Sequence, residues 1–346
     1  MSENKAIVVT AVKTLEIQDL EMPKIGPNEV LYEVHSCSLC TVEQRVYSGA
    51  KNFGFPLLGG HENAGVVIAV GDDVREYKVG DKVIATLGYC GECEYCKTGK
   101  GSSCKNSMKA KKRVNFPGPI IGGGLAKYLA VPSWQLCKIP DNANFDHFAL
   151  TEPLACCVHS IEKARVEFGD VVVVIGAGIM GMLHVRLAKL KGAYVIVSEV
   201  DQARRLKATE MGADVTVDPS TEDAVARIKE LTNNKGADVV INAIATPKIW
   251  PDAIGMLAPY GRLVAYSSQD SKEPVGVDMD KLHSKEYEII GTVSPTMESN
   301  LRATKLIALG MVDMEALIDS RYESADCTKA FDRASSPNTY RCIIHI

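Results

Sequence analysis

The chain lacks any apolar segment long enough to cross a membrane, and it lacks a strong excess of either charge. Its longest apolar stretches are strand-length, whereas a membrane-spanning helix needs about 20 apolar residues. The net charge of −4 does not favour nucleic acid or an anionic membrane as a partner. No apolar signal-peptide core follows Met1, because the sequence runs directly into the strand-like residues 6–9. We therefore expect a cytoplasmic protein.

Internal repeats and low-complexity segments are also absent. The apolar fraction of 46% and the charged fraction of 24% are typical of a globular protein. A chain of 346 residues exceeds one typical core, so about two domains are expected.

The sequence pattern changes near residue 168. Up to about residue 150, short strands alternate with Gly, Pro and Asn, which predicts an irregular β-rich region with strands at 30–35, 65–70, 82–87 and 125–131. Val171–Ile175 is then continuously apolar, as expected for a parallel strand buried on both faces.

Strands and helices alternate regularly after that point, which predicts a doubly wound parallel sheet. The predicted strands are 194–198, 214–217, 238–241, 262–266 and 288–293. The predicted helices begin at Ile179 and cover about 202–211, 223–231 and 248–257, with one more at 298–309.

A glycine motif follows the first of these strands. Gly176, Gly178 and Gly181 form G-x-G-x-x-G with Ile179 and Met180 inside it, and the motif opens a helix, which is the context of a dinucleotide-binding site. The glycines permit the tight turn, the approach of the pyrophosphate and the packing of helix on strand.

Glu199 ends the next strand, where a carboxylate accepts hydrogen bonds from the adenosine ribose and repels a 2′-phosphate. This favours NAD over NADP. Arg204 is a second candidate, either lying over the adenine or contacting a 2′-phosphate, with a solvated helix position as the alternative.

Four of the eleven cysteines form one cluster at about residues 88–106. Cys90, Cys93, Cys96 and Cys104 follow the pattern C-x2-C-x2-C-x7-C, which predicts a closed tetrahedral zinc site with a structural role. An iron–sulfur cluster is the competing interpretation. The basic run at 109–113 downstream is interpreted as a solvated loop.

Three further segments carry chemistry. Cys40 follows Cys37-Ser38-Leu39, His61 and Glu62 lie in Gly60-His61-Glu62-Asn63, and Glu152 lies in Thr151-Glu152-Pro153. With the four-cysteine cluster and the nucleotide motif, these segments resemble the zinc-containing medium-chain alcohol and polyol dehydrogenases, such as sorbitol and threonine dehydrogenases. The resemblance covers essentially the whole chain.

The resemblance implies a catalytic zinc held by Cys40, His61 and Glu152, with Glu62 beside it and either carboxylate as ligand. Glu43, in place of the usual Asp, is expected to orient a ligand. A thiolate, an imidazole and a carboxylate leave one position for the alcohol oxygen, and zinc acts as a Lewis acid that favours hydride transfer to the nicotinamide.

Some positions depart from the family pattern. Val42 and Arg45 stand where relatives usually carry the proton-relay Ser or Thr and His, so Thr41 is the candidate relay. Arg45 is a candidate contact for a polar substrate group. Tyr47, Phe55 and Phe116 match regions that line the substrate pocket in relatives, with ordinary core positions as the alternative.

The resemblance further implies a split architecture. A GroES-like β-rich catalytic domain would cover 1–151 and 297–346, with a Rossmann NAD-binding domain at 152–296 between its parts, two zinc ions per chain, and a homotetramer or homodimer. The expected reaction is NAD-linked oxidation of a secondary alcohol or polyol, or reduction of the ketone. The alternatives are a related aldehyde, ketone or activated-double-bond reductase, and a non-catalytic binding protein on this fold.

Overall fold

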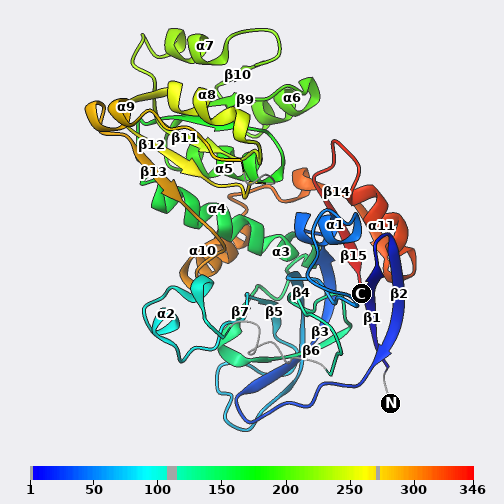
Figure 1. Cartoon of the computed structure of the whole chain (residues 1–346). Helices are drawn as coiled ribbons and strands as arrows, with labels where there is room; N and C mark the ends of the chain where they lie inside the picture. Colours follow the sequence, from blue (N-terminus) through cyan, green and yellow to red (C-terminus); the bar gives the residue numbers. More distant parts are fainter. Residues whose placement is uncertain (1–2, 107–114, 270–272) are drawn as a thin grey trace. The chain divides into compact units, whose positions relative to one another are not determined.

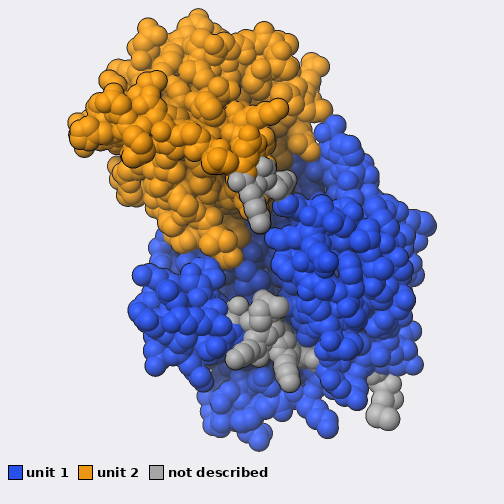
Figure 2. Space-filling view, viewed as in Figure 1, with its two compact units in different colours: residues 1–155, 295–346 blue, residues 156–294 orange. Residues whose placement is uncertain are grey.

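The computed structural model describes residues 3–106, 115–269 and 273–346, so the basic run at 109–113 lies outside the described residues. The chain divides into two compact units, coloured separately in Figure 2. Unit 1 comprises residues 1–155 and 295–346, and unit 2 comprises residues 156–294. The resemblance implies boundaries at 151/152 and 296/297. Helix α4 (Thr151–Lys163) runs across the first boundary.

Unit 2 is built on a six-stranded parallel sheet with the order β10-β9-β8-β11-β12-β13 (Figure 1). This order reverses between β8 and β11, which is the topological switch point where such sheets bind nucleotides. The sheet confirms the predicted Rossmann fold. Its strands are β8 (Val171–Ile175), β9 (Tyr194–Ser198), β10 (Val215–Val217), β11 (Ala237–Asn242), β12 (Leu257–Ala265) and β13 (Glu288–Gly291). Its helices are α5 (Ile179–Leu190), α6 (Gln202–Glu210), α7 (Ala224–Leu231), α8 (Trp250–Gly255) and α9 (Met279–Ser284).

Local sequence explains these elements. Residues 172–175 of β8 are at most 1% exposed, because the central strand is covered on both faces. Helices α6 and α7 are capped at their N-termini by Asp201 and Asp223, whose carboxylates accept hydrogen bonds from the N–H groups of Arg204 and Ala226.

Two elements of unit 2 differ from the sequence-based prediction. Strand β12 begins at Leu257 instead of 262, because Pro259 and Gly261, which are typical of a turn, are accommodated by a register shift where β12 pairs with β11. The short helix α9, capped by Asp278, was not predicted.

Unit 1 contains a seven-stranded sheet with the path β14-β15-β3-β4-β5-β7, in which β6 also pairs with β3, and a separate antiparallel hairpin of β1 and β2. The strands are β1 (Asn4–Ala11), β2 (Thr14–Leu20), β3 (Glu29–Ser38), β4 (Glu62–Val70), β5 (Lys82–Ala85), β6 (Tyr128–Pro132), β7 (Leu136–Lys138), β14 (Ile318–Glu323) and β15 (Arg341–His345). The helices are α1 (Thr41–Tyr47), α2 (Glu94–Lys97), α3 (Phe145–Ala149), α10 (Met297–Ala308) and α11 (Cys327–Ala334).

The apolar core of unit 1 lies around β3, and it includes Val30, Tyr32, Val34 and residues of β1, β15 and α11. The pairing of β3 with β4 places the end of β3 beside the start of β4. Among the described residues, no helix has both the length and the apolar character needed to cross a membrane.

Candidate functional site

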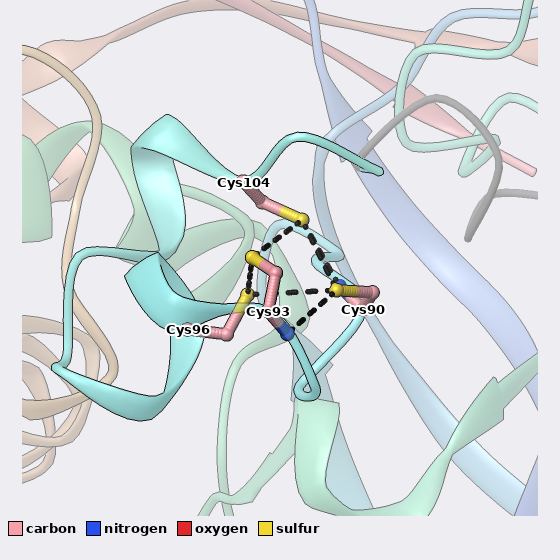
Figure 3. Close-up of side chains that lie close together, drawn as sticks. All are labelled: Cys90, Cys93, Cys96 and Cys104. Atoms are coloured by element: carbon pink, nitrogen blue, oxygen red, sulfur yellow. Dashed lines mark hydrogen bonds between the residues drawn. The ribbon is translucent and has the colours of Figure 1, made fainter.

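The four cysteines of the predicted lobe converge in unit 1. Figure 3 shows their sulfur atoms pointing toward one common centre. The Sγ atoms lie 3.4 Å apart for Cys93 and Cys96, and 3.5 Å apart for Cys90 and Cys104. The Cys90–Cys96 and Cys93–Cys104 separations are 3.8 and 4.0 Å.

These separations suit a single metal ion. Four sulfur ligands at about 2.3 Å from a tetrahedral zinc would lie about 3.8 Å from each other. An iron–sulfur cluster would need its ligands farther apart, because several iron and sulfide atoms would have to fit between them. The backbone N–H groups of Glu92 and Cys93 also lower the pKa of Cys90 to about 6, which favours the thiolate that zinc requires.

A second group forms where β3 and β4 pair. Ser38 lies opposite Glu62 in the antiparallel register, so Cys40, two residues past Ser38, comes close to His61, one residue before Glu62. Cys40, His61 and Glu62 offer ligand atoms that all lie within 4.8 Å of one another. Cys40 is the N-cap residue of α1 and makes no side-chain capping bond, so its thiol is available to a metal.

Glu43 orients His61. Its Oε1 atom lies 3.1 Å from His61 Nδ1 and accepts a hydrogen bond from the N–H of Gly60 at 2.9 Å. Glu43 is 1% exposed, and although burial raises its pKa, the opposing effect of His61 leaves the pKa lowered. An ionised Glu43 holds the proton on Nδ1, which leaves Nε2 as the ligand atom. The donor set therefore fits zinc.

Glu62 is held by two residues that sequence reasoning missed. Its Oε2 atom accepts hydrogen bonds from Ser38 Oγ at 2.5 Å and Arg341 Nε at 3.0 Å, and its Oε1 atom accepts one from Arg341 Nη2 at 2.8 Å. Nη2 also lies 3.7 Å from Cys40 Sγ. Both oxygens of Glu62 are thus already engaged with protein groups.

The chain offered only a weak signal for Arg341. It is a single arginine at the start of the apolar strand β15, it is 2% exposed, and it lies 279 residues from its partner in the sequence. A buried arginine requires an anionic partner, but nothing in the local sequence identifies which one.

The remaining candidate residues near the cluster lie as follows. Glu152 is 9% exposed in the first turn of α4, and it acts electrostatically on Arg341, but it is not part of the group within 4.8 Å. Thr41 is exposed at the start of α1, and Arg45 is half-buried in the last turn of that helix.

Tyr47 lies in the apolar core of unit 1. It is 2% exposed, packs edge-on against Phe331 and donates a hydrogen bond from its hydroxyl group to Asp332 at 3.0 Å. Its place in the core of unit 1 agrees with the alternative interpretation of Tyr47 as an ordinary core position. Phe55 and Phe116 are partly buried and pack against the same core.

The glycine motif of unit 2 makes a tight turn before α5, with the geometry expected of a dinucleotide cradle. Gly176 has a φ of +92°, and a Cβ on Gly181 would lie 1.9 Å from the carbonyl oxygen of Gly176. A Cβ on Gly178 would meet open space, so this position leaves room for a pyrophosphate. Helix α5 begins at Ile179, followed by Met180, and Gly178 provides no side chain to cap its N–H groups.

Glu199 lies beside this cradle. Its carboxylate accepts hydrogen bonds from the N–H groups of Ala177 at 2.7 Å and Asp201 at 2.9 Å. Arg205, rather than Arg204, has a clear structural role: it donates to the carbonyl oxygen of Glu199 and pairs with Asp218 at 3.0 Å. In the described part of the chain, the guanidinium of Arg204 makes no ion pair.

Comparison with known proteins identifies the family. The family model described as "Alcohol dehydrogenase GroES-like domain" matches residues 26–141, and the model described as "Zinc-binding dehydrogenase" matches residues 180–308.

Curated relatives and solved structures agree with these matches. An L-threonine 3-dehydrogenase from Pyrococcus furiosus is 30% identical over 319 residues, which are 90% of this chain and 89% of that protein. A D-arabitol-phosphate dehydrogenase from Enterococcus avium is 29% identical over 94% of this chain and 92% of its own. The structure of a protein assigned as a zinc-binding dehydrogenase from Sinorhizobium meliloti, bound to NADP, superimposes with a TM-score of 0.90 at 27% identity, covering 100% of both chains.

The chain therefore belongs to the zinc-containing medium-chain alcohol and polyol dehydrogenase family, and it is an oxidoreductase with a GroES-like domain and a Rossmann domain.

Proposed function

We propose that this family member oxidises a secondary alcohol or polyol with NAD, or reduces the corresponding ketone. The observation that carries the proposal is the group of Cys40, His61 and Glu62, of which His61 and Glu62 are buried, with Glu43 behind the imidazole. Relatives whose names specify arabitol phosphate, sorbitol and threonine as substrates support a polar alcohol.

The catalytic zinc would be held by Cys40, His61 and a carboxylate. Glu62 already accepts three hydrogen bonds, from Ser38 and from Arg341, so Glu152 is the better candidate for the third ligand. The bound metal supplies a Lewis acid that lowers the pKa of the alcohol. The protein's own contribution is to orient His61 through Glu43, and to balance the charge around Cys40 with Arg341.

The lobe formed by Cys90, Cys93, Cys96 and Cys104 would hold a second, structural zinc. Four sulfur ligands leave no open position for a substrate, so this ion would only stabilise a loop that has little core of its own.

Thr41 would pass the alcohol proton to water. Its exposed hydroxyl lies next to Cys40 in the chain, whereas Val42 has no transferable proton. A Thr41→Val variant should then turn over more slowly than Thr41→Ser. Equal rates would remove Thr41 from the mechanism.

Glu199 supports NAD as the cofactor. Two backbone N–H groups hold its carboxylate beside the glycine cradle, and this negative charge accepts ribose hydroxyls but repels a 2′-phosphate. Arg204 would contribute stacking on the adenine, and Arg45 a contact to a polar group of the substrate.

A homo-oligomer, either a dimer or a tetramer, would use the edge of the unit 2 sheet. Strand β13 ends the sheet, and Ile289 and Val293 are 40% and 68% exposed there. An edge with unpaired backbone groups and exposed apolar side chains can be covered by the same strand of a second copy.

The proposal is tested by following nicotinamide absorbance with polyols, inositols, sugars and simple secondary alcohols, with NAD and NADP in parallel. We expect the parent protein to turn over with NAD and to bind two zinc ions. The Cys40→Ala variant should lose the turnover and one of the two zinc ions. Cys137→Ala is the matched control, because Cys137 is a buried thiol outside both metal groups. Turnover that survives in Cys40→Ala would refute the zinc-dependent mechanism.

A further inference from the structure

Unit 2 contains a pocket away from the dinucleotide cradle. The pocket has a volume of about 390 Å³, and helices α7, α8 and α9 (Figure 1) contribute Lys229, Ile254 and Lys281 to its lining. Lys285 and Tyr287, between α9 and β13, complete the polar part of the wall. Its volume falls within the range of small-molecule sites, which is about 300–1,000 Å³.

The pocket lies at the amino-terminal end of the parallel sheet. Lys229 donates a hydrogen bond to the carbonyl oxygen of Leu257, the first residue of β12, and Tyr287 directly precedes β13. The glycine motif follows the carboxyl end of β8. Because all six strands are parallel, the two sites lie at opposite ends of the sheet, so a ligand in this pocket does not occupy the nucleotide cradle.

Positive charge dominates the lining. Among the described residues, three lysines line the pocket with only one carboxylate, that of Asp278, which lies 3.7 Å from Lys281. Within residues 3–106, 115–269 and 273–346, the ammonium group of Lys285 has no carboxylate partner. Lys229 and Lys285 line the same pocket, and burial and then repulsion from Lys285 lower the pKa of Lys229.

Structural contacts account for Lys229 and Lys281, since Lys281 pairs with Asp278, but not for Lys285. Lys229 donates hydrogen bonds to the carbonyl oxygens of Leu257 and Lys235, at 2.9 and 3.3 Å. It therefore satisfies backbone acceptors at the start of β12 and just before β11. Lys285 makes no such bond in the described residues, yet it lines the same cavity. An anion in the pocket would relieve the repulsion between these ammonium groups.

We propose that this pocket binds a small phosphate monoester, with the phosphate among the lysines and the organic part against Tyr287 and Ile254. Lysine binds phosphate as a point charge. Three ammonium groups around one phosphate dianion would balance its negative charge and relieve their own mutual repulsion. The aromatic ring and the aliphatic side chain provide an apolar wall for a sugar or a base. Sugar phosphates and mononucleotides share this chemistry.

The proposal is tested by titration calorimetry on the zinc-loaded full-length protein with saturating NAD, which blocks the nucleotide cradle. The probes are inorganic phosphate, glucose 6-phosphate and AMP, with glucose as the uncharged control. We expect both esters to bind more tightly than phosphate and glucose not to bind. Tighter binding of glucose 6-phosphate would identify a sugar phosphate as the ligand class, and tighter binding of AMP would identify a nucleotide.

The variants locate the site. Lys281→Ala and Lys285→Ala should each weaken binding of the esters about tenfold, as expected for loss of one charged hydrogen bond. Lys191→Ala, an exposed lysine of unit 2 outside the pocket, should leave binding unchanged. Tyr287→Ala should weaken binding of the esters but not of phosphate. Because Lys281 and Lys285 are exposed, thermal unfolding of these two variants should match that of the parent protein.

Three results would overturn the proposal. They are the absence of binding by both esters, equal affinities in the lysine variants and Lys191→Ala, and binding of phosphate that gains nothing from the organic group.

Discussion

The buried ion pair between Arg341 and Glu62 leads to a quantitative prediction. The Glu62 carboxylate is fully buried, and it accepts two hydrogen bonds from Arg341 and one from Ser38. Replacing Arg341 by Met would leave it only the bond from Ser38 among these three. Removing one partner of a buried pair leaves an uncompensated charge in a low-dielectric environment and costs about 3–5 kcal/mol. We therefore expect Arg341→Met to lower the free energy of unfolding of unit 1 by about this amount.

A double variant separates this cause from simple loss of packing. Glu62→Leu combined with Arg341→Met removes both charges, so it should be less destabilising than Arg341→Met alone. A double-mutant cycle should give a coupling of about 2 kcal/mol or more. Arg333→Met is the matched control, because Arg333 makes a two-fold contact with Asp319 but is 42% exposed, and such a surface pair contributes about 1 kcal/mol or less.

Denaturant unfolding followed by fluorescence can report unit 1 alone. The chain has two tryptophans, Trp134 in unit 1 and Trp250 in unit 2, so Trp250→Phe leaves Trp134, which packs against Tyr89, as the single probe. All proteins would carry Cys40→Ala, so that zinc at this site does not contribute to the differences. If Arg341→Met cost no more than Arg333→Met, the argument from a buried, ionised pair would be refuted.

Three further predictions concern the cofactor, the metal lobe and the dependence on pH. Glu199→Ser should raise kcat/KM with NADP relative to NAD, because the charge that repels a 2′-phosphate is lost, and steady-state kinetics with both cofactors measures the ratio. Cys96→Ser should reduce the zinc content by one ion per chain and speed proteolysis of the lobe, as seen by metal analysis and mass spectrometry. Burial lowers the pKa of His345, but Glu323 and Asp146 outweigh it and raise the pKa above 6.5, so His345 stabilises the fold fully below pH 6.5 and progressively less as pH rises through the raised value. His345→Gln should therefore destabilise the protein more at about pH 6 than at about pH 9, as measured by thermal unfolding at each pH.

Each of these predictions has a result that would contradict it. An unchanged cofactor ratio in the Glu199 variant would exclude this carboxylate from cofactor selection. Cys137 is a buried cysteine outside the lobe, so the Cys137→Ser variant should retain both zinc ions. Loss of one zinc ion from Cys137→Ser as well would show that Cys96→Ser acts only through general destabilisation. A constant difference in stability across the pH range would mean that His345 does not carry a charge in the folded protein.

Short-range patterns determined much of this protein from sequence alone. The glycine motif lies within six residues after a buried strand, and the four cysteines lie within fifteen residues, so local geometry nearly dictates which groups meet. The alternation of strands and helices after Val171 was sufficient to predict the Rossmann sheet, because crossover connections in parallel sheets have one strongly preferred hand. The resemblance in Cys40, His61 and Glu152 pointed to the family.

Only the tertiary structure decided which side chains surround the candidate catalytic group. The register of β3 against β4 places Ser38 opposite Glu62, and the pairing of β15 with β3 brings Arg341 to the same carboxylate. Tyr47 points into the core because of its position on α1, although its sequence neighbourhood matched a pocket in relatives. Such contacts depend on strand pairing and on the burial of charge between segments far apart in the chain, and neither is encoded in the residues next to each group.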